Sequence, residues 1–336
     1  MIKAENLSYS FPHKELYNKI SFTLEDDVHC AFIGTNGTGK STLVNMILYP
    51  DKYLYDGKLI VDVPGRIGYV SQFYTVEEEK EITVFDYISE EFKQTGVEVT
   101  EQTFEVNGKK YRNIIAHFGP KEGAVTVIGA HYDSYADTPG ADDNASGVAG
   151  LIELAHLLQK NPPKNSVELI AYTLEEPPFF KTENMGSVHH AHAFKTSGRP
   201  LRLMISIEMI GYFSDKSDSQ NYPIGLLKTL YPNKGNFIGI IGRSAESKEA
   251  RKIKALMSGA TDLPVYSMNA PVSLVTGLDF SDHRNFWAEG FNALLITDTA
   301  FFRNKNYHEL EDTADTLDYS RMAKVIQGIY AVIQNY

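Results

Sequence analysis

Three apolar segments in the middle of the chain are each followed by acidic or histidine side chains. Near-continuous apolar runs of this kind are typical of parallel strands that are buried on both faces of a sheet. Segments with helical patterns alternate with these runs, which predicts an α/β fold, a mixed, mostly parallel sheet flanked by helices. The apolar segments span residues 125–130, 167–172 and 201–207, and the side chains that follow them are His131 and Asp133, Glu175 and Glu176, and Glu208.

The polar side chains that end these segments should converge, because ligands of open sheets bind at the carboxyl ends of the strands. Residues 129–147, GAHYDSYADTPGADDNASG, also contain Asp143, ten residues beyond Asp133. A neutral imidazole binds zinc well, and Asp133 is placed to accept the free ring N–H of His131 and so fix its tautomer. The pattern therefore predicts a metal site at this edge of the sheet.

Composition narrows the choice of partners and metal ligands. The chain of 336 residues has a formal net charge of -11, which argues against a nucleic-acid partner. Cys30 is the only cysteine, so an intrachain disulfide and a thiolate metal site are excluded, and any metal must be held by His, Asp and Glu. The first residues do not resemble a secretory signal, and no apolar run reaches the roughly 18 residues of a spanning helix. We therefore expect a cytoplasmic protein without a membrane partner.

A glycine-rich loop, GTNGTGKST, lies between an expected strand at residues 29–33 and an expected helix at residues 42–48. This order of strand, loop and helix is the context of a P-loop. Backbone N–H groups and the helix N-terminus would face phosphate oxygens, while Lys40 reaches the outer phosphates and Ser41 binds magnesium. The candidate nucleotide-binding residues are Gly34, Asn36, Gly37, Gly39, Lys40, Ser41 and Thr42.

The segment around this loop resembles the ABC ATPases, especially the soluble tandem type known as ABC-F. The resemblance runs through the P-loop, through Phe11 at the position that stacks on adenine, and through IGYVSQ, which ends in Gln72. The LSGGQ-type signature and the apolar run ending in Asp-Glu are missing. The resemblance therefore implies a truncated fragment that binds ATP and magnesium weakly at most and has no ATPase activity.

Residues 77–91 are rich in charge, and Val84, Phe85 and Ile88 form an apolar stripe within them. The pattern favours a solvated helix or a linker. The resemblance changes family just beyond this segment, so we expect a domain boundary at residues 93 and 94. The expected domains are an ABC ATPase fragment over residues 1–93 and a second domain over residues 94–336.

Residues 94–336 carry a series of motifs: GAHYDS, PGADDNASG, the paired acids of LEE, ISIEMIGY, SDHRNFWAEG and YHELEDTADTLDY. In this order they resemble the MH-clan di-zinc exopeptidases, the family of aminopeptidases S and Y, glutamate carboxypeptidase and glutaminyl cyclase. The resemblance implies a zinc exopeptidase fold over the whole range. It also implies a cis peptide bond between Asp143 and Asn144.

The same resemblance assigns roles to single residues. It implies that His131 and Glu208 bind one zinc ion, that Glu176 and His308 bind the other, and that Asp143 bridges the two. The family usually has aspartate where this chain has Glu208, so a single zinc ion stays the alternative to two. The implied catalytic residues are Glu175 as general base, Asp133 as the partner of His131, and Tyr307 as an oxyanion donor.

The expected activity follows from these roles. Two zinc ions that share a water lower its pKa, and Glu175 takes the proton and passes it to the leaving amine. We expect a zinc metallopeptidase, in the first place an aminopeptidase that hydrolyses the N-terminal bond of a peptide or aminoacyl substrate. The alternatives are a single-zinc aminoacyl transferase of the glutaminyl cyclase type and a non-catalytic, ATP-binding module of the ABC-F type.

Three further features near the expected site have open roles. Asp282, in SDHRNFW, resembles a residue that supports the substrate pocket of the family. Residues 177–180, PPFF, either line a pocket for an apolar side chain or form a rigid turn with buried rings. Asp312 and Asp315 are expected to form a turn and a cap before a last helix at residues 320–336.

Overall fold

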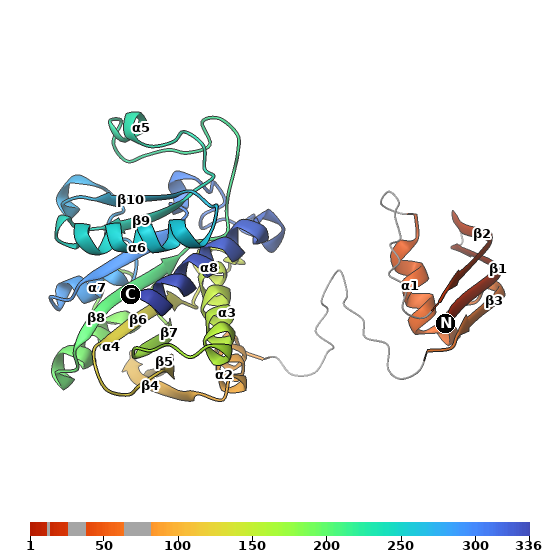
Figure 1. Ribbon diagram of the computed structural model, residues 1–336, viewed down its shortest axis with the longest axis horizontal. Helices are drawn as coiled ribbons and strands as arrows, with labels where there is room; N and C mark the ends of the chain where they lie inside the picture. Colours follow the sequence, from red (N-terminus) through yellow and green to blue (C-terminus); the bar gives the residue numbers. More distant parts are fainter. Residues whose placement is uncertain (12–13, 26–37, 64–81) are drawn as a thin grey trace. The chain divides into compact units, whose positions relative to one another are not determined.

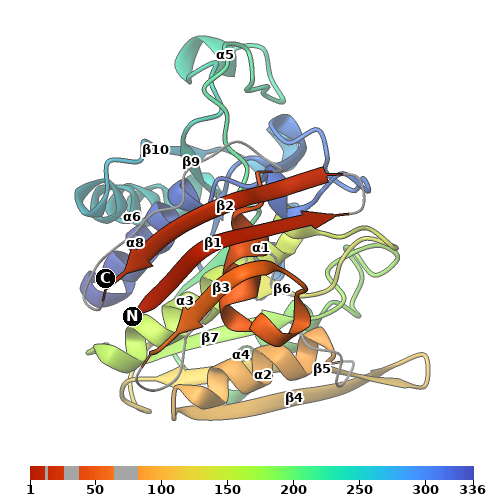
Figure 2. The same cartoon turned by 90° about the vertical axis from the view of Figure 1, so that its right-hand side faces the viewer.

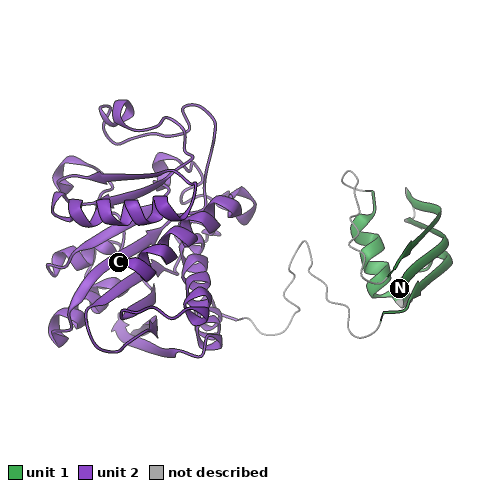
Figure 3. Cartoon of the chain, in the orientation of Figure 1, with its two compact units in different colours: residues 1–80 green, residues 81–336 purple. Residues whose placement is uncertain are grey.

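The computed structural model describes residues 1–11, 14–25, 38–63 and 82–336. The chain divides into two compact units, Met1–Lys80 and Glu81–Tyr336 (Figure 3). Several features expected from the sequence lie outside the described residues: the strand at residues 29–33, Gly34, Asn36, Gly37, Gln72 and the side chain of Phe11.

The first unit contains a three-stranded antiparallel sheet in the order β2-β1-β3, with one helix against it. The strands are β1 (Ile2–Phe11), β2 (Lys14–Leu24) and β3 (Asp56–Val61), and the helix is α1 (Lys40–Leu48). Buried side chains of α1, among them Leu43 and Met46, form one core cluster with those of the strands, among them Leu7. The helix expected after the glycine-rich loop is therefore present, and it begins at Lys40 rather than at Thr42.

The boundary between the units falls earlier than residues 93 and 94. Helix α2 (Val84–Gln94), expected to be a solvated helix or linker, buries Phe85, Ile88 and Phe92 in the core of the second unit. Thr83 caps this helix by accepting a hydrogen bond from the backbone N–H of Asp86. Figure 2 shows α2 running beside β4 and β5, which it contacts. The apolar stripe therefore assigns α2 to the second unit, and its many charges face solvent.

The second unit is built on an eight-stranded sheet in the order β10-β9-β11-β8-β6-β7-β5-β4 (Figure 1). Neighbouring strands run parallel at β10-β9, β11-β8, β8-β6 and β6-β7, and antiparallel at β9-β11, β7-β5 and β5-β4. The expected mixed, mostly parallel sheet is confirmed. The strands are β4 (Glu98–Val106), β5 (Lys109–Phe118), β6 (Val125–His131), β7 (Val167–Tyr172), β8 (Leu201–Glu208), β9 (Ile238–Gly242), β10 (Val265–Asn269) and β11 (Ala293–Thr297).

Helices cover both faces of this sheet, and the alternation of side chains along each strand supplies a core to each face. On β7, Leu169 and Ala171 pack in one core, and Ile170 and Tyr172 in the other. The first core holds α2, α3 (Gly147–Lys160), α6 (Ser247–Ala260) and α8 (Tyr319–Asn335), and the second holds α4 (Gly186–Ser197) and α7 (His283–Ala288). Burial on both faces explains why these strands are apolar without interruption.

One long loop stands apart from the layers. The loop after β8 carries the short helix α5 (Leu227–Leu230) and projects from the side of the sheet formed by β9 and β10 (Figure 1). None of its four helical residues is buried. Among the described residues, no helix is long and apolar enough to cross a bilayer.

Candidate metal centre

The ends of three adjacent strands and two loops bring all five predicted ligands together. His131 is the last residue of β6, Glu208 is the last residue of β8, and Glu176 follows β7. Asp143 lies in the turn that leads into α3, and His308 lies in the loop before α8. The expectation that the strand ends converge is met, because β7, β6 and β8 are parallel neighbours.

The five side chains form two groups that share Asp143. In the inner half of the centre, Nε2 of His131 lies 3.2 Å from Oε1 of Glu208 and 3.3 Å from Oδ1 of Asp143. In the outer half, Nε2 of His308 lies 3.2 Å from Oδ2 of Asp143 and 3.2 Å from Oε2 of Glu176. Asp143 thus offers one oxygen to each half, which is the arrangement of a bridging carboxylate.

The donor set fits divalent metal ions. In each half, one imidazole nitrogen and two carboxylate oxygens lie within 4.8 Å of one another. Three atoms of the outer half, Oδ2 of Asp143, Oε1 of Glu176 and Nε2 of His308, are buried without a hydrogen-bond partner. Burying so many acids without compensation is costly, and a cation among them removes this cost. Imidazole and carboxylate donors with no thiolate are typical of catalytic zinc sites.

The electrostatic field at the centre also favours positive charge. Burial alone would lower the pKa of both imidazoles, but the surrounding carboxylates raise the pKa of His308 to about 9 and that of His131 well above its usual value. Burial raises the pKa of Glu208 to about 7. A cluster that stabilises imidazolium in this way stabilises a bound cation for the same reason.

The structure identifies the tautomer of His131, although by another route than expected. Nδ1 of His131 lies 2.9 Å from the backbone carbonyl oxygen of Asp133. A carbonyl can only accept a hydrogen bond, so Nδ1 carries a proton, and loss of the other proton would free the lone pair of Nε2 for a metal. The Asp133 carboxylate instead accepts hydrogen bonds from the backbone N–H groups of Glu175 and Glu176, at 3.2 and 3.0 Å. Asp133 therefore positions three residues of the centre at once.

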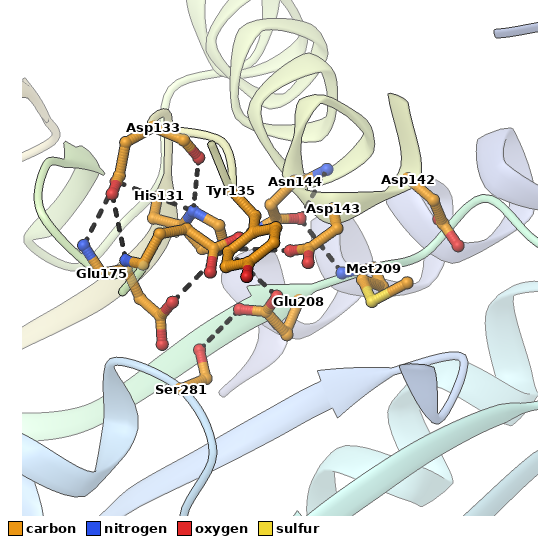
Figure 4. Close-up of polar contacts among 12 residues, drawn as sticks. His131, Asp133, Tyr135, Asp142, Asp143, Asn144, Glu175, Glu208, Met209 and Ser281 are labelled. Carbon is orange, nitrogen blue, oxygen red and sulfur yellow. Dashed lines mark hydrogen bonds and ion pairs between the residues drawn. The ribbon is translucent and has the colours of Figure 1, made fainter. Parts of the chain in front are cut away.

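Glu208 is held by a partner that the sequence did not reveal. The Ser281 hydroxyl donates to Oε2 of Glu208 at 2.7 Å (Figure 4). The hydroxyl oxygens of Ser206 and Ser281 lie 2.9 Å apart. Both serines are fully buried. Since Oε2 of Glu208 is occupied by Ser281, Oε1 is the oxygen that faces His131. The only signal in the sequence was the position of Ser281 beside Asp282.

The loop that carries Asp143 is anchored from two sides. Asp312, expected in a simple turn, accepts hydrogen bonds from the backbone N–H groups of Asp142 and Asp143. The Asn144 side chain donates to the carbonyl oxygen of Ile207 and accepts from the N–H of Met209, which ties the loop to the end of β8. The peptide bond between Asp143 and Asn144 is cis, as the family resemblance implied.

His308 lies between two tyrosine rings. The ring centroids of Tyr135 and His308 are 4.1 Å apart with planes at 5°, and those of Tyr307 and His308 are 3.8 Å apart with planes at 18°. Two rings this close and this parallel to the imidazole must lie on its opposite faces. Burial, reinforced by the nearby carboxylates, raises the pKa of Tyr307 above its usual range, so its hydroxyl remains a donor. Tyr135 was not predicted as part of the site.

Glu175 lies beside both halves, and its carboxylate forms a third possible metal-binding group with His131 and Glu176. The side chain is buried, and Oε2 lies 4.0 Å from Nε2 of His131. Burial raises the pKa of Glu175 well above its usual value, as expected for a group that exchanges protons near neutral pH. Asp282 is also fully buried, and burial raises its pKa to about 6.

Four of the candidate nucleotide-binding residues lie among the described residues. Lys40, Ser41 and Thr42 form the first turn of α1, and Gly39 precedes it with a φ of 91°. The Tyr17 hydroxyl donates a hydrogen bond to the carbonyl oxygen of Gly39. The first unit therefore presents a glycine and the N-terminus of a helix where the sequence predicted the end of a P-loop.

A doubly covered α/β sheet with carboxylate and imidazole groups at its strand ends is the arrangement of a metal-dependent hydrolase. The chain belongs to peptidase family M28, whose family model matches residues 113–333. A second model, ABC transporter, matches residues 17–138, which begin within β2, extend into the second unit and overlap the M28 match from residue 113.

Two relatives share long stretches of sequence with this chain. The uncharacterised protein YfbL of Escherichia coli is 48% identical over 258 residues, which are 74% of this chain and 79% of YfbL. The probable aminopeptidase YDR415C of Saccharomyces cerevisiae is 26% identical over 222 residues, 61% of this chain and 52% of the yeast protein. The chain thus spans about half the length of this aminopeptidase relative.

Solved structures share the fold of the second unit. LapB from Legionella pneumophila superimposes with a TM-score of 0.59 at 21% identity, covering 75% of this chain and 64% of LapB. The glutaminyl cyclase from Bacteroides thetaiotaomicron gives a TM-score of 0.57 at 20% identity, covering 75% of this chain and 88% of that structure. At these identities the similarity establishes the fold alone.

Proposed function

We propose that the second unit is a zinc-dependent aminopeptidase. The observation that carries the proposal is the pocket beside the metal centre, which has a volume of about 1080 Å³ including its mouth and is lined by Asp143, Glu175, Glu176 and Glu208. None of its described lining residues is a lysine or an arginine. Bound zinc would offset the charge of these acids, but no lysine or arginine of the described lining could pair with the carboxylate of a free C-terminus. The pocket therefore favours an aminopeptidase over a carboxypeptidase.

In this proposal His131, Glu208 and Asp143 hold one zinc ion, and Glu176, His308 and Asp143 hold a second. Zinc supplies polarisation of the substrate carbonyl and acidification of water when it is bound. Glu175 accepts a proton from the attacking water and delivers it to the leaving amine. The Tyr307 hydroxyl donates a hydrogen bond to the carbonyl oxygen of the substrate, on which negative charge develops. Asp133 holds His131 in position through its backbone carbonyl oxygen and Glu175 through its carboxylate.

The test of this proposal is the variant Glu175→Gln, measured for zinc content and for hydrolysis of amino acid amides. Glutamine keeps the size of the side chain but accepts no proton, so we expect normal zinc content with hydrolysis reduced by a factor of at least about 100. Exposed Glu183→Gln, on the same loop as Glu175, serves as the control. Turnover in Glu175→Gln equal to that of the wild type would contradict the role of Glu175.

A second candidate is an aminoacyl transferase of the glutaminyl cyclase type. It is favoured by the structural similarity to the Bacteroides thetaiotaomicron cyclase and by Glu208, which stands where the resembled family usually has aspartate. Elemental analysis and incubation with an N-terminal glutamine peptide separate the two candidates. One zinc ion per chain together with cyclisation of the glutamine would support the transferase.

For the first unit we propose an incomplete ABC ATPase fragment without hydrolytic activity. The ABC transporter match and the position of Lys40 and Ser41 at the start of α1 support weak binding of ATP with magnesium. We also propose a cytoplasmic location, which the use of a single cysteine in 336 residues favours. Equilibrium dialysis with ATP and assay of released phosphate test the proposal for this unit.

A further inference from the structure

The floor of the pocket beside the metal centre is the face of β9 and β11 that is turned away from α6 and α8. On β9, Ile238 and Ile240 point into the core under α6 and α8, so Gly239 and Ile241 point to the other face. Gly239 and Ile241 both line the pocket. The same alternation on β11 sends Leu295 and Thr297 into it. These strands form the floor, and the loop that carries α5 forms part of the walls.

The walls are rich in aromatic rings. The loop that carries α5 contributes Tyr222 and Tyr231, whose hydroxyls donate to the carbonyl oxygens of Pro232 and Ser267 at 2.6 and 2.9 Å. Because these hydroxyls are occupied, the pocket meets mainly the apolar parts of the rings. The other wall includes Phe280, Phe301 and Phe302, with ring centroids 6.2 Å apart for Phe280 and Phe301 and 4.4 Å apart for Phe301 and Phe302.

Charge is confined to one end of this pocket. The charged and titratable lining residues other than tyrosine are Glu175 and the ligands Asp143, Glu176, Glu208 and His308. A substrate that places its ammonium group and scissile bond at this end must place its first side chain among the rings. The position therefore suits a large apolar group and offers no ion-pair partner to a charged one.

Gly239 gives the floor its depth. Its φ lies outside the left-handed region, so the backbone does not require glycine there. A Cβ at this position would lie 3.2 Å from the carbonyl oxygen of Thr297 and 3.7 Å from both Ile241 Cδ1 and Thr299 Cγ2. Glycine inside a strand generally weakens it or marks a close approach of another group. Gly239 therefore leaves a space in the floor of the pocket that any side chain at this position would narrow.

We propose that this pocket selects an aromatic first residue, phenylalanine, tyrosine or tryptophan, and that Gly239 determines this specificity. The inference rests on the proposed aminopeptidase function. An aromatic side chain buries more area than leucine and packs edge to face with the rings of the walls. Within the wall this packing already occurs, since the ring of Tyr266 meets Tyr231 at 77° and Phe237 at 75°. A leucine side chain would fill less of the space and make no such ring contacts.

The first experiment compares kcat/KM for the amides of tryptophan, phenylalanine, leucine and alanine. We expect the aromatic amides to exceed leucine amide about tenfold and alanine amide about a hundredfold. In Gly239→Ala the added methyl group shortens the pocket. We therefore expect kcat/KM to fall about tenfold or more for the aromatic amides, mainly through KM, with little change for alanine amide. A preference for leucine amide in the wild type overturns the inference.

Gly259→Ala is the matched control, because a Cβ at Gly259 on α6 meets nothing within 4 Å. Its substrate profile should equal that of the wild type. If Gly239→Ala fails to fold, Ile241→Phe narrows the same face of β9 and must shift the preference in the same direction. An unchanged profile in a folded variant at either position contradicts the role assigned to the floor.

Binding to the Glu175→Gln variant separates this inference from the proposed function. Calorimetric titration with phenylalanine amide and leucine amide measures the pocket without turnover. Tighter binding of phenylalanine amide, weakened by Gly239→Ala, supports the pocket even if no amide is hydrolysed, in which case only the peptidase function falls. If the wild type hydrolyses all the amides and Glu175→Gln binds phenylalanine amide and leucine amide equally well, the peptidase function stands and the aromatic specificity is refuted.

Discussion

The two halves of the metal centre share Asp143 but are supported in different ways. The ligands of the inner half, His131 and Glu208, are buried, and each is fixed by a hydrogen bond from or to a protein group. The outer half leaves Nε2 of His308 and Oε1 of Glu176 without hydrogen-bond partners, and the side chain of His308 is 21% exposed. Its imidazole is held by the faces of two tyrosines instead.

This difference has a physical consequence. A ligand fixed by hydrogen bonds keeps its direction even before a metal binds, whereas a stacked ring can still slide or rotate in its plane. The inner half is therefore preorganised, and the outer half adjusts more easily. We expect the loss of a side chain that supports the inner half to reduce zinc affinity more than the loss of one that supports the outer half.

The largest effect is expected from Asp143→Asn, because Asp143 offers an oxygen to both halves. Losing its charge should reduce the binding of both ions and lower amide hydrolysis by a factor of about 1,000 or more. Zinc content by elemental analysis and kcat measure the two effects. Asp137→Asn, at an exposed position of the same segment, should change neither. Retention of one tightly held ion in Asp143→Asn would show that the halves are independent.

An intermediate effect is expected from Ser281→Ala, which removes the hydrogen bond to Oε2 of Glu208. Loss of a hydrogen bond that orients a metal ligand typically costs about 10- to 100-fold in metal affinity. Zinc binding by the inner half should therefore weaken by about that factor. Competition with a chelator measures this affinity. Since Ser206 bonds Ser281 rather than Glu208, Ser206→Ala should weaken the same half by a smaller factor.

The double substitution Glu208→Asp with Ser281→Ala sharpens the interpretation. A shorter aspartate cannot reach both Ser281 and the position that Oε1 of Glu208 takes beside His131. The effects of the two substitutions should therefore be less than additive. Full additivity would mean that Ser281 acts through the fold and not through Glu208.

All five ligands were predicted from the sequence, but the apolar pattern alone indicated only those beside strand ends, whereas His308 came from the family resemblance. His131 and Glu208 end apolar strands that are parallel neighbours in the sheet, so the order of motifs alone places them at one edge. Periodicity of apolar residues predicted the strands, the two-sided burial and the last helix for the same reason. These features depend on a repeating local pattern, and such patterns are visible without coordinates.

The supporting groups depend on loop conformations that no pattern encodes. Ser281 reaches Glu208 across 73 residues of sequence, and Tyr135 reaches His308 from the loop after β6. The bond to His131 comes from the backbone of Asp133 rather than from its carboxylate, because the chain turns directly after β6. Helix α2 was ambiguous for another reason, since three buried apolar residues stood among many charges. Tertiary packing decided each of these cases.

The smallest effect is expected from Tyr135→Ala, which removes one of the two rings that hold His308. A stacked aromatic pair contributes about 0.5–1.5 kcal/mol, so zinc affinity of the outer half should fall about two- to tenfold. Tyr135→Phe keeps the ring and should retain the affinity, which separates stacking from any role of the hydroxyl. Exposed Tyr319→Ala on α8 controls for the loss of a tyrosine.

Chelator competition on the fully loaded protein gives the zinc affinities of both halves in one experiment. If Tyr135→Ala weakened the outer half as strongly as Ser281→Ala weakens the inner half, stacking would hold a ligand as firmly as a hydrogen bond, and the proposed difference in preorganisation between the two halves would be wrong.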